Sequence, residues 1–131
     1  MPLTVKRIQF EGEPFERKEG DSDPFVDILI QENPPGSGTF QPFNLTGYTV
    51  RFEASTLAML PLFAGTAAIL DAVGGEVSYT PVAGDIAAMA VPAGELAEDY
   101  CAVWRLSKAG TQLTIPRGDK VRRIIVGKKL E

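Results

Sequence analysis

The alternation of apolar and polar residues with a period of two is the feature that most constrains the fold of this chain. Two segments carry it most clearly, YTVRFEA (48–54) and YCAVWRLS (100–107). Each places four side chains on one face of an extended chain: Tyr48, Val50, Phe52 and Ala54 in the first, and Tyr100, Ala102, Trp104 and Leu106 in the second. The 3.6-residue period of an amphipathic helix barely appears. The pattern therefore predicts half-buried β-strands.

Turn-forming residues divide the chain into short segments of this kind, because 13 of its 131 residues are glycine and 10 are proline. We expect strands in residues 3–10, 25–31, 48–54, 66–72, 75–81, 100–107, 111–115 and 121–128. Residues 11–24, 32–42 and 82–99 are expected to be loops, the last with room for one helical turn. Residues 55–65 are ambiguous, although Pro61 prevents a long helix there. Regularly spaced short strands are typical of an all-β sandwich or barrel.

Within residues 25–31 the alternation assigns side chains to two faces. One face carries Val26, Ile28 and Ile30, and the other carries Phe25, Asp27 and Leu29. In residues 75–81, Val77 and Tyr79 point one way, and Glu76 and Ser78 point the other.

The composition fits one soluble domain over residues 1–131, with 44% hydrophobic and 23% charged residues. The net charge of −4 argues against a nucleic-acid or anionic-membrane surface. No apolar run approaches the ~20 residues of a membrane span, and residues 1–20 lack the apolar core of a signal peptide. We therefore expect a protein made in the cytoplasm, with neither a nucleic acid nor a membrane as partner.

The chain contains no histidine, which removes the commonest general base and the commonest transition-metal ligand. Its single cysteine, Cys101, has no histidine to activate it and lies within a strand, so we interpret it as a packed structural residue. No phosphate-binding loop is present, and nothing selects a carboxylate pair for glycoside chemistry. The sequence predicts a protein that is not an enzyme, with no catalytic residues and no cofactor.

An acidic segment offers the one candidate metal site. Carboxylates at Asp21, Asp23 and Asp27, with Glu19 and Glu32 nearby, could hold Ca²⁺ through oxygen ligands. The glycine and the closing glutamate of a calcium-binding loop are missing, so we interpret the segment as a solvated acidic turn and predict no metal.

Four further features have an ordinary structural interpretation. The RGD tripeptide at 117–119 and the NLT sequon at 44–46 are both typical of turns. Trp104, between two apolar neighbours at spacing two, is expected in the core rather than stacked on a sugar. A basic cluster near the C-terminus is expected to be a solvated edge strand and tail: Lys120, Arg122, Arg123, Lys128 and Lys129.

The order of the motifs over residues 15–127 resembles the Ig-like N-terminal domain of phage baseplate upper proteins and related phage tail structural proteins. A charged Gly-Asp segment precedes an aliphatic strand, a Leu-Thr-Gly turn opens the next, a Gly-x-Val-x-Tyr strand follows, and a Gly-to-Tyr step leads into a strand with an aromatic residue. The matching residues are Gly20, Asp21, Leu45 to Gly47, Gly75, Val77, Tyr79, Gly94, Tyr100 and Trp104. The step from Gly94 to Tyr100 is longer than in the family. EDYCAVW is also similar to a strand of antibody domains, but the partner cysteine is missing.

The resemblance implies an Ig-like antiparallel β-sandwich of seven to nine short strands. It implies a non-enzymatic structural protein of a tailed-phage virion, an adaptor or decoration domain of the baseplate, tail or neck. Such a protein docks in multiple copies on other virion proteins and on itself. The family's proteins continue into fibrous or receptor-binding-protein-docking regions, so here we expect the docking role without the fibre.

The expected docking surfaces are the loops 11–24, 32–42 and 82–99, since loops at the ends of a sandwich carry binding. The strand 3–10 could pair with the sheet of a neighbour, and the basic tail could meet an acidic partner. The alternative is a carbohydrate- or receptor-binding module whose exposed loop aromatics, Phe15, Phe40 and Phe43, contact the ligand.

Overall fold

The computed structural model describes residues 9–27, 30–32, 36, 38–116 and 120–129, and in them the fold is an all-β sandwich with mainly antiparallel pairing. Twelve strands and one short helix are present in these ranges. Eight of the strands have four or more residues, within the predicted seven to nine, and the other four have two or three. The predicted fold class is confirmed.

Seven strands form the larger sheet. They are β1 (Gln9–Phe10), β2 (Phe15–Lys18), β6 (Thr49–Thr56), β7 (Pro61–Thr66), β10 (Ala97–Lys108), β11 (Thr111–Ile115) and β12 (Lys120–Gly127). The long strand β10 lies in the middle, antiparallel to β6 on one side and to β11 and β12 on the other. Trp104 faces Ile115 and Ala102 faces Arg122, so β11 and β12 share one row, divided by residues 116–119.

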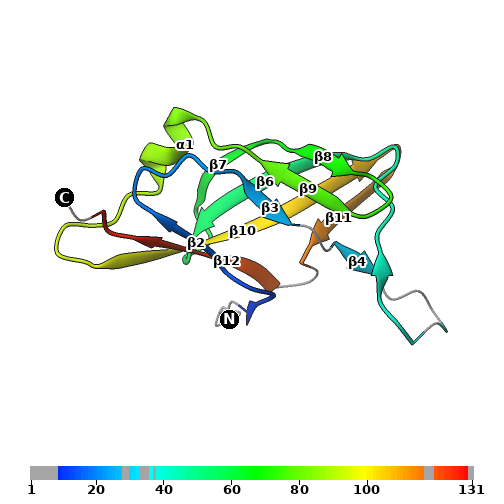
Figure 1. The fold of residues 1–131 in the computed structure, drawn as a ribbon, viewed down its shortest axis with the longest axis horizontal. Coiled ribbons are helices and arrows are strands. Elements are labelled where there is room, and N and C mark those ends of the chain that lie inside the picture. The colour runs from blue at the N-terminus through cyan, green and yellow to red at the C-terminus, as the bar shows by residue number, and fades with distance from the viewer. Residues whose placement is uncertain (1–8, 28–29, 33–35, 37, 117–119, 130–131) are drawn as a thin grey trace, which may run out of the picture.

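A smaller sheet covers one face of the larger one (Figure 1). It has the order β3 (Phe25–Asp27), β9 (Glu76–Tyr79), β8 (Ala68–Asp71). The strands expected in residues 66–72 and 75–81 are confirmed as β8 and β9, which pair as an antiparallel hairpin. The helix α1 (Ala83–Ala88) follows β9, and β4 (Gln31–Glu32) and β5 (Gln41–Pro42) form a separate hairpin at the opposite end of the molecule (Figure 1).

Aromatic rings from both sheets meet at Phe52. Its ring stacks on those of Phe25 and Tyr79, with centroids 4.8 and 5.1 Å away, and lies edge-on to Trp104 at 4.8 Å. The predicted inward faces of 48–54 and 100–107 are confirmed in β6 and β10, where Val50, Phe52, Ala54, Tyr100, Ala102, Trp104 and Leu106 are buried. Trp104 is a core residue, as predicted, and burial removes each large apolar side chain from water at a gain of about 1.5–3 kcal/mol.

The expectation that residues 11–24 are only a loop is wrong, because they contain β2. This strand pairs in parallel with β12, and the ring of Phe15 packs edge-on against Phe25 at 5.3 Å. Phe15 is the one large apolar residue in this segment, and the charged and turn-forming residues around it masked the strand in the sequence. Since β2 and β1 both pair with β12, the predicted solvated edge strand at the C-terminus is also wrong: β12 lies inside the sheet.

The predicted face assignment in residues 25–31 also needs correction. Phe25 is buried and Val26 is 40% exposed, so the face of Phe25 and Asp27 turns toward the core. Ile30, which follows the end of β3, is buried. Ile28 and Leu29 lie outside the described residues, as does most of the expected strand 3–10.

The turn before β6 matches its predicted form. The Asn44 side chain accepts hydrogen bonds from the backbone N–H and the hydroxyl of Thr46, at 3.0 and 2.6 Å. Gly47 follows with a φ of 84°, which a residue with a side chain rarely adopts. The NLT sequon is therefore part of a turn that starts the central hairpin.

Candidate docking surfaces

An ionic cluster joins the two sheets at the lining of a surface cleft. Asp27 in β3 accepts hydrogen bonds from the guanidinium of Arg122 in β12 and, at 3.1 Å, from the indole of Trp104 in β10. The Arg122 guanidinium also donates to the carbonyl of Glu13 at 2.5 Å and lies 4.4 Å from the ring centroid of Phe15. The even spacing of Arg122, Ile124 and Val126 explains this inward position and was the available sequence signal.

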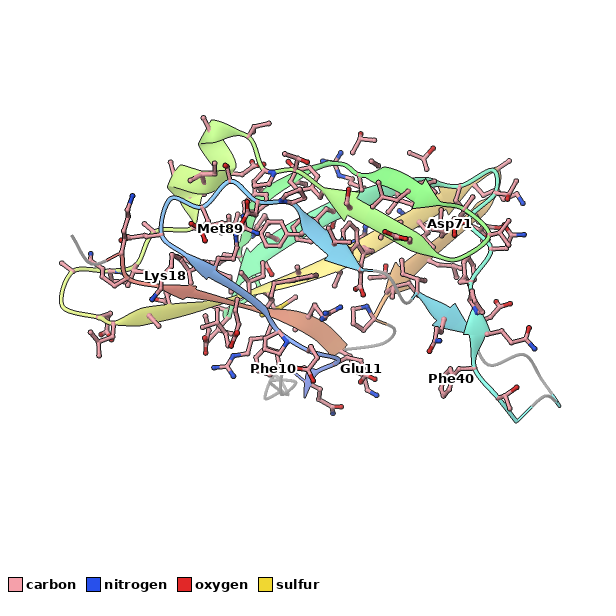
Figure 2. All side chains as sticks on the ribbon, viewed as in Figure 1. Phe10, Glu11, Lys18, Phe40, Asp71 and Met89 are labelled. Carbon is pink, nitrogen blue, oxygen red and sulfur yellow. The ribbon has the colours of Figure 1, made fainter. Side chains whose placement is uncertain are left out.

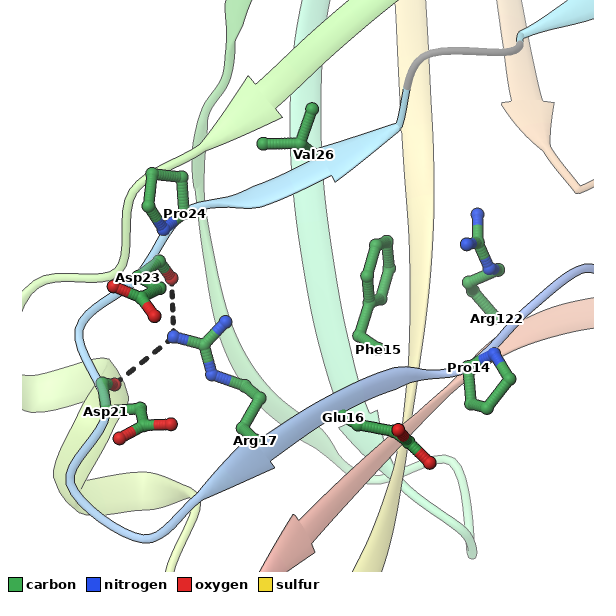
Figure 3. A pocket seen from close by; sticks show the side chains of 9 residues that line it. All are labelled: Pro14, Phe15, Glu16, Arg17, Asp21, Asp23, Pro24, Val26 and Arg122. Atoms are coloured by element: carbon green, nitrogen blue, oxygen red, sulfur yellow. Dashed lines mark hydrogen bonds between the residues drawn. The ribbon is translucent and has the colours of Figure 1, made fainter.

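The cleft lies between β2 and β3 and has a volume of about 360 Å³ (Figure 3). Arg17 crosses it, bonds to the backbone carbonyls of Asp21 and Asp23, and lies 4.1 Å from the ring centroid of Phe25. Burial lowers the pKa of the Arg17 guanidinium from its usual value. Both arginines that line the cleft therefore bond to the protein itself, and we assign the cleft a structural role.

The acidic segment is divided among separate partners. The carboxylate of Asp21 accepts the backbone N–H of Lys18 at 2.9 Å, Glu19 accepts that of Val91, and Asp27 belongs to the inter-sheet cluster. Among the described residues no three acidic or cysteine side chains gather in a way that could hold a metal ion.

Two of the predicted docking loops meet at one end of the sandwich. The carboxylate of Glu19, in the loop after β2, accepts the N–H of Val91 at 2.9 Å and lies 3.8 Å from the ammonium of Lys128. The backbone N–H of Lys128 in turn bonds to the carbonyl of Leu96 at 2.8 Å. Hydrogen bonding to Val91, followed by the charge of Lys128, lowers the pKa of Glu19. We call this surface, residues 18–24, 82–96 and 128–129, the loop end.

A buried hydrogen bond holds α1 at this end. Asp85 accepts the hydroxyl of Tyr79 at 2.5 Å and the backbone N–H of Val82 at 3.1 Å. Burial, with the Asp85 carboxylate, raises the pKa of Tyr79 to about 12. Val82, beside α1, is exposed, and Leu96, whose carbonyl accepts the N–H of Lys128, is 82% exposed. An anchored surface with exposed apolar side chains can bind a partner at little cost in loop ordering.

The third predicted loop lies at the opposite end of the molecule, on the β4–β5 hairpin (Figures 1 and 2). Phe40 is 68% exposed there. The expectation that three loop aromatics are exposed is wrong for the other two. Phe43 is buried, and Phe15 is half-buried against the core, because each has aromatic neighbours inside the sandwich.

The basic cluster of the C-terminal strand is largely neutralised. Lys120 pairs with Glu11 at 3.0 Å and Arg123 with Asp99 at 2.8 Å, while Arg122 and Lys128 bind the carboxylates named above. Four of the five basic side chains in this cluster are therefore paired within the protein, which argues against a free basic tail that binds an acidic partner. The RGD tripeptide lies outside the described residues.

Cys101 is fully buried, which fits the structural role predicted for it. Burial, with the nearby Asp99 carboxylate, raises the pKa of its thiol. A thiol of this kind is a poor nucleophile.

The comparisons with known proteins identify no family for this chain. No protein-family model matches the chain, and no curated protein matches it either. Within the part of the chain that the structure describes, no helix is long and apolar enough to cross a membrane.

Proposed function

We propose that this protein is a non-enzymatic structural component of a tailed-phage virion, an adaptor or decoration domain of the baseplate, tail or neck. It acts by docking on other virion proteins, in multiple copies. The loop end is its main docking surface.

The observation that carries the proposal is the anchored loop end. Glu19 joins two loops that are 72 residues apart in sequence, and Lys128 adds the C-terminal strand to them. The exposed Leu96 lies beside this junction and offers an apolar contact without a large ordering cost.

The resemblance of the motifs gives the class of protein. Leu45 to Gly47 form the turn before β6, Gly75 precedes β9 with its buried Val77 and Tyr79, and Trp104 lies in β10. The resembling residues thus occupy turns and core positions of one sandwich, which supports the proposal at the level of fold. The virion assignment comes from the order of these motifs.

Complementation tests the proposal. A phage whose own copy of the gene is inactivated is grown on cells that supply tagged wild-type protein, Leu96→Asp or Phe40→Asp, and the tag is measured in purified particles. We expect incorporation of the wild type and of Phe40→Asp, and at least a ten-fold loss for Leu96→Asp. Absence of the wild-type protein from the particles would overturn the proposal.

The carbohydrate- or receptor-binding alternative depends on Phe40, the one predicted contact ring that is well exposed. The same experiment separates the two functions. Loss of adsorption to cells by particles with normal amounts of Phe40→Asp would favour receptor binding.

A further inference from the structure

The strand β7 forms one edge of the larger sheet. Among the described residues it pairs with β6 alone, and its Ala64 and Thr66 are exposed. No charged residue occurs from Ala54 to Leu70. Natural proteins usually protect such an edge with charges, because unpaired backbone groups bind further strands.

The register shows which backbone groups are free. Phe52 faces Gly65 and Ala54 faces Phe63, and the N–H of Ala67 bonds to the carbonyl of Val50 at 2.8 Å. Hydrogen-bonded residues alternate along an antiparallel strand. Phe63, Gly65 and Ala67 therefore bond toward β6, and the N–H and C=O groups of Leu62, Ala64 and Thr66 point away from the sheet.

These three residues form a set that is symmetric about Ala64. In an antiparallel pair of two copies, Ala64 would face Ala64, and Leu62 would face Thr66 of the other copy. Every one of these cross-strand pairs is uncharged, so two copies with a net charge of −4 each can approach here without opposed like charges.

The exposed apolar residues on either side also match across such a pair. Met59 and Leu60 precede β7 and Leu70 follows it, and all three are exposed. Antiparallel pairing about Ala64 brings the Met59–Leu60 turn of one copy toward the segment of the other that leads to Leu70. The same contact covers apolar surface on both copies, as a two-fold interface requires.

The edge at β2 is protected by comparison. Pro14 precedes the strand. At its other end both backbone groups of Lys18 are already bonded to Asp21: the N–H donates to the Asp21 carboxylate at 2.9 Å, and the carbonyl accepts the Asp21 N–H at 3.1 Å. Arg17 occupies the carbonyls of the following loop, and the neighbouring edge strand β3 has only three residues. Of the edge strands β2, β3 and β7, β7 is the longest and the only one without a charged residue.

We propose that two copies of this chain associate through β7, antiparallel about Ala64, and so join their larger sheets into one. The inference deepens the proposed docking function, on which it rests, by naming one partner as a second copy of the chain.

Light scattering on a sizing column tests the inference, with Ala64→Lys as the variant and Val26→Lys, on the edge strand β3, as the matched control. We expect the wild type and Val26→Lys at twice the 14.1 kDa of one chain. Ala64→Lys opposes two like charges at the axis, so we expect a dimer weakened at least about ten-fold. A monomeric wild type at several hundred micromolar, or an unchanged Ala64→Lys dimer, would overturn the inference.

Disulfide cross-linking tests the same register independently, in case Ala64→Lys does not fold. Ala64→Cys is expected to form a disulfide between copies under oxidised glutathione, while Val26→Cys is not; the native Cys101 is buried in both. Equal cross-linking of the two variants would contradict the register. A monomeric protein that still enters particles overturns this inference alone, whereas a dimer that is absent from particles overturns the docking function.

Discussion

Asp27 in the smaller sheet and Arg122 in the larger sheet form an ion pair across the interior of the sandwich. Their side chains are 16% and 15% exposed, and Asp27 is also bonded to the indole of Trp104. Three strands, β3, β10 and β12, thus meet at one carboxylate. The pair links the two sheets beside the cleft between β2 and β3, which Arg122 lines in Figure 3.

Removing this carboxylate tests its structural role. Asp27→Ala leaves the largely buried Arg122 charge without its partner, so we expect the free energy of unfolding to fall by about 3 kcal/mol, at the low end for buried pairs. Glu11→Ala, in the exposed pair with Lys120, is expected to cost less than about 1 kcal/mol. Urea unfolding followed by circular dichroism measures both.

A double variant separates charge burial from packing. Asp27→Asn with Arg122→Met removes both charges and keeps an acceptor for the Trp104 indole, so its stability should return to within about 1 kcal/mol of the wild type. A double variant as unstable as Asp27→Ala would contradict the assignment of the loss to the unpaired Arg122.

Gly65 allows the close approach of β7 to Tyr79. A Cβ atom on Gly65 would lie 2.6 Å from the Tyr79 ring, so Gly65→Ala should cost about 1–3 kcal/mol through overpacking. Gly84 in α1 has open space around it, and Gly84→Ala should stabilise the protein by up to about 1 kcal/mol. Thermal unfolding of the two variants compares them; equal effects would contradict this packing.

The hydrogen bond between Tyr79 and Asp85 predicts how stability depends on alkaline pH. The folded state raises the pKa of Tyr79 from its ordinary value of 10.0 to about 12, so above pH 10 the folded protein binds more protons than the unfolded chain. The contribution of Tyr79 is complete below pH 10 and is lost as the pH rises toward 12.

Tyr79→Phe checks this dependence. Its free energy of unfolding should be about 1–3 kcal/mol lower at pH 7, because the buried Asp85 loses a donor, and should fall less steeply above pH 10 than that of the wild type. Chemical denaturation at pH 7, 9, 10 and 11 gives both slopes. Parallel slopes would show that Tyr79 titrates at its ordinary pKa in the folded state.

The buried Cys101 predicts a thiol that reacts only on unfolding. Its burial and raised pKa should make the rate of modification by a disulfide reagent at pH 8 at least a hundred-fold slower in native protein than in denatured protein. Absorbance of the released chromophore gives the rate. Fast reaction of the native protein would contradict the packed position.

The alternation of residues was sufficient to predict the central strands. Phe52 and Trp104 lie where a period of two places them, because each is on a face that packs against the second sheet. The alternation did not predict β2 with its Phe15, and although it places Arg122 on the inward face of β12, it does not show the partner of that charge. The strand β2 depends on pairing with a segment more than 100 residues away, and an inward arginine is stable only because Asp27 is opposite it.

For the candidate surfaces too, local sequence predicts the loops but not the contacts between distant segments. The loop before the long central strand could be predicted from Pro92 and Gly94, with room for the helical turn that is α1. Its predicted end at residue 99 is wrong, because β10 already begins at Ala97. The junction of Glu19 with Val91 could not be predicted, since nothing local to either residue indicates the other. The free edge of β7 depends on the order of the strands in the sheet, which the sequence does not specify.

The copy number of the chain in purified phage particles tests the central claim most directly. Quantitative mass spectrometry with isotope-labelled peptides gives its amount relative to the capsid and tail proteins. A structural docking protein predicts a fixed ratio of several copies per particle, in a whole-number multiple of the symmetry of the part it joins. Less than one copy per particle, or an amount that washes away during purification, would contradict the proposal.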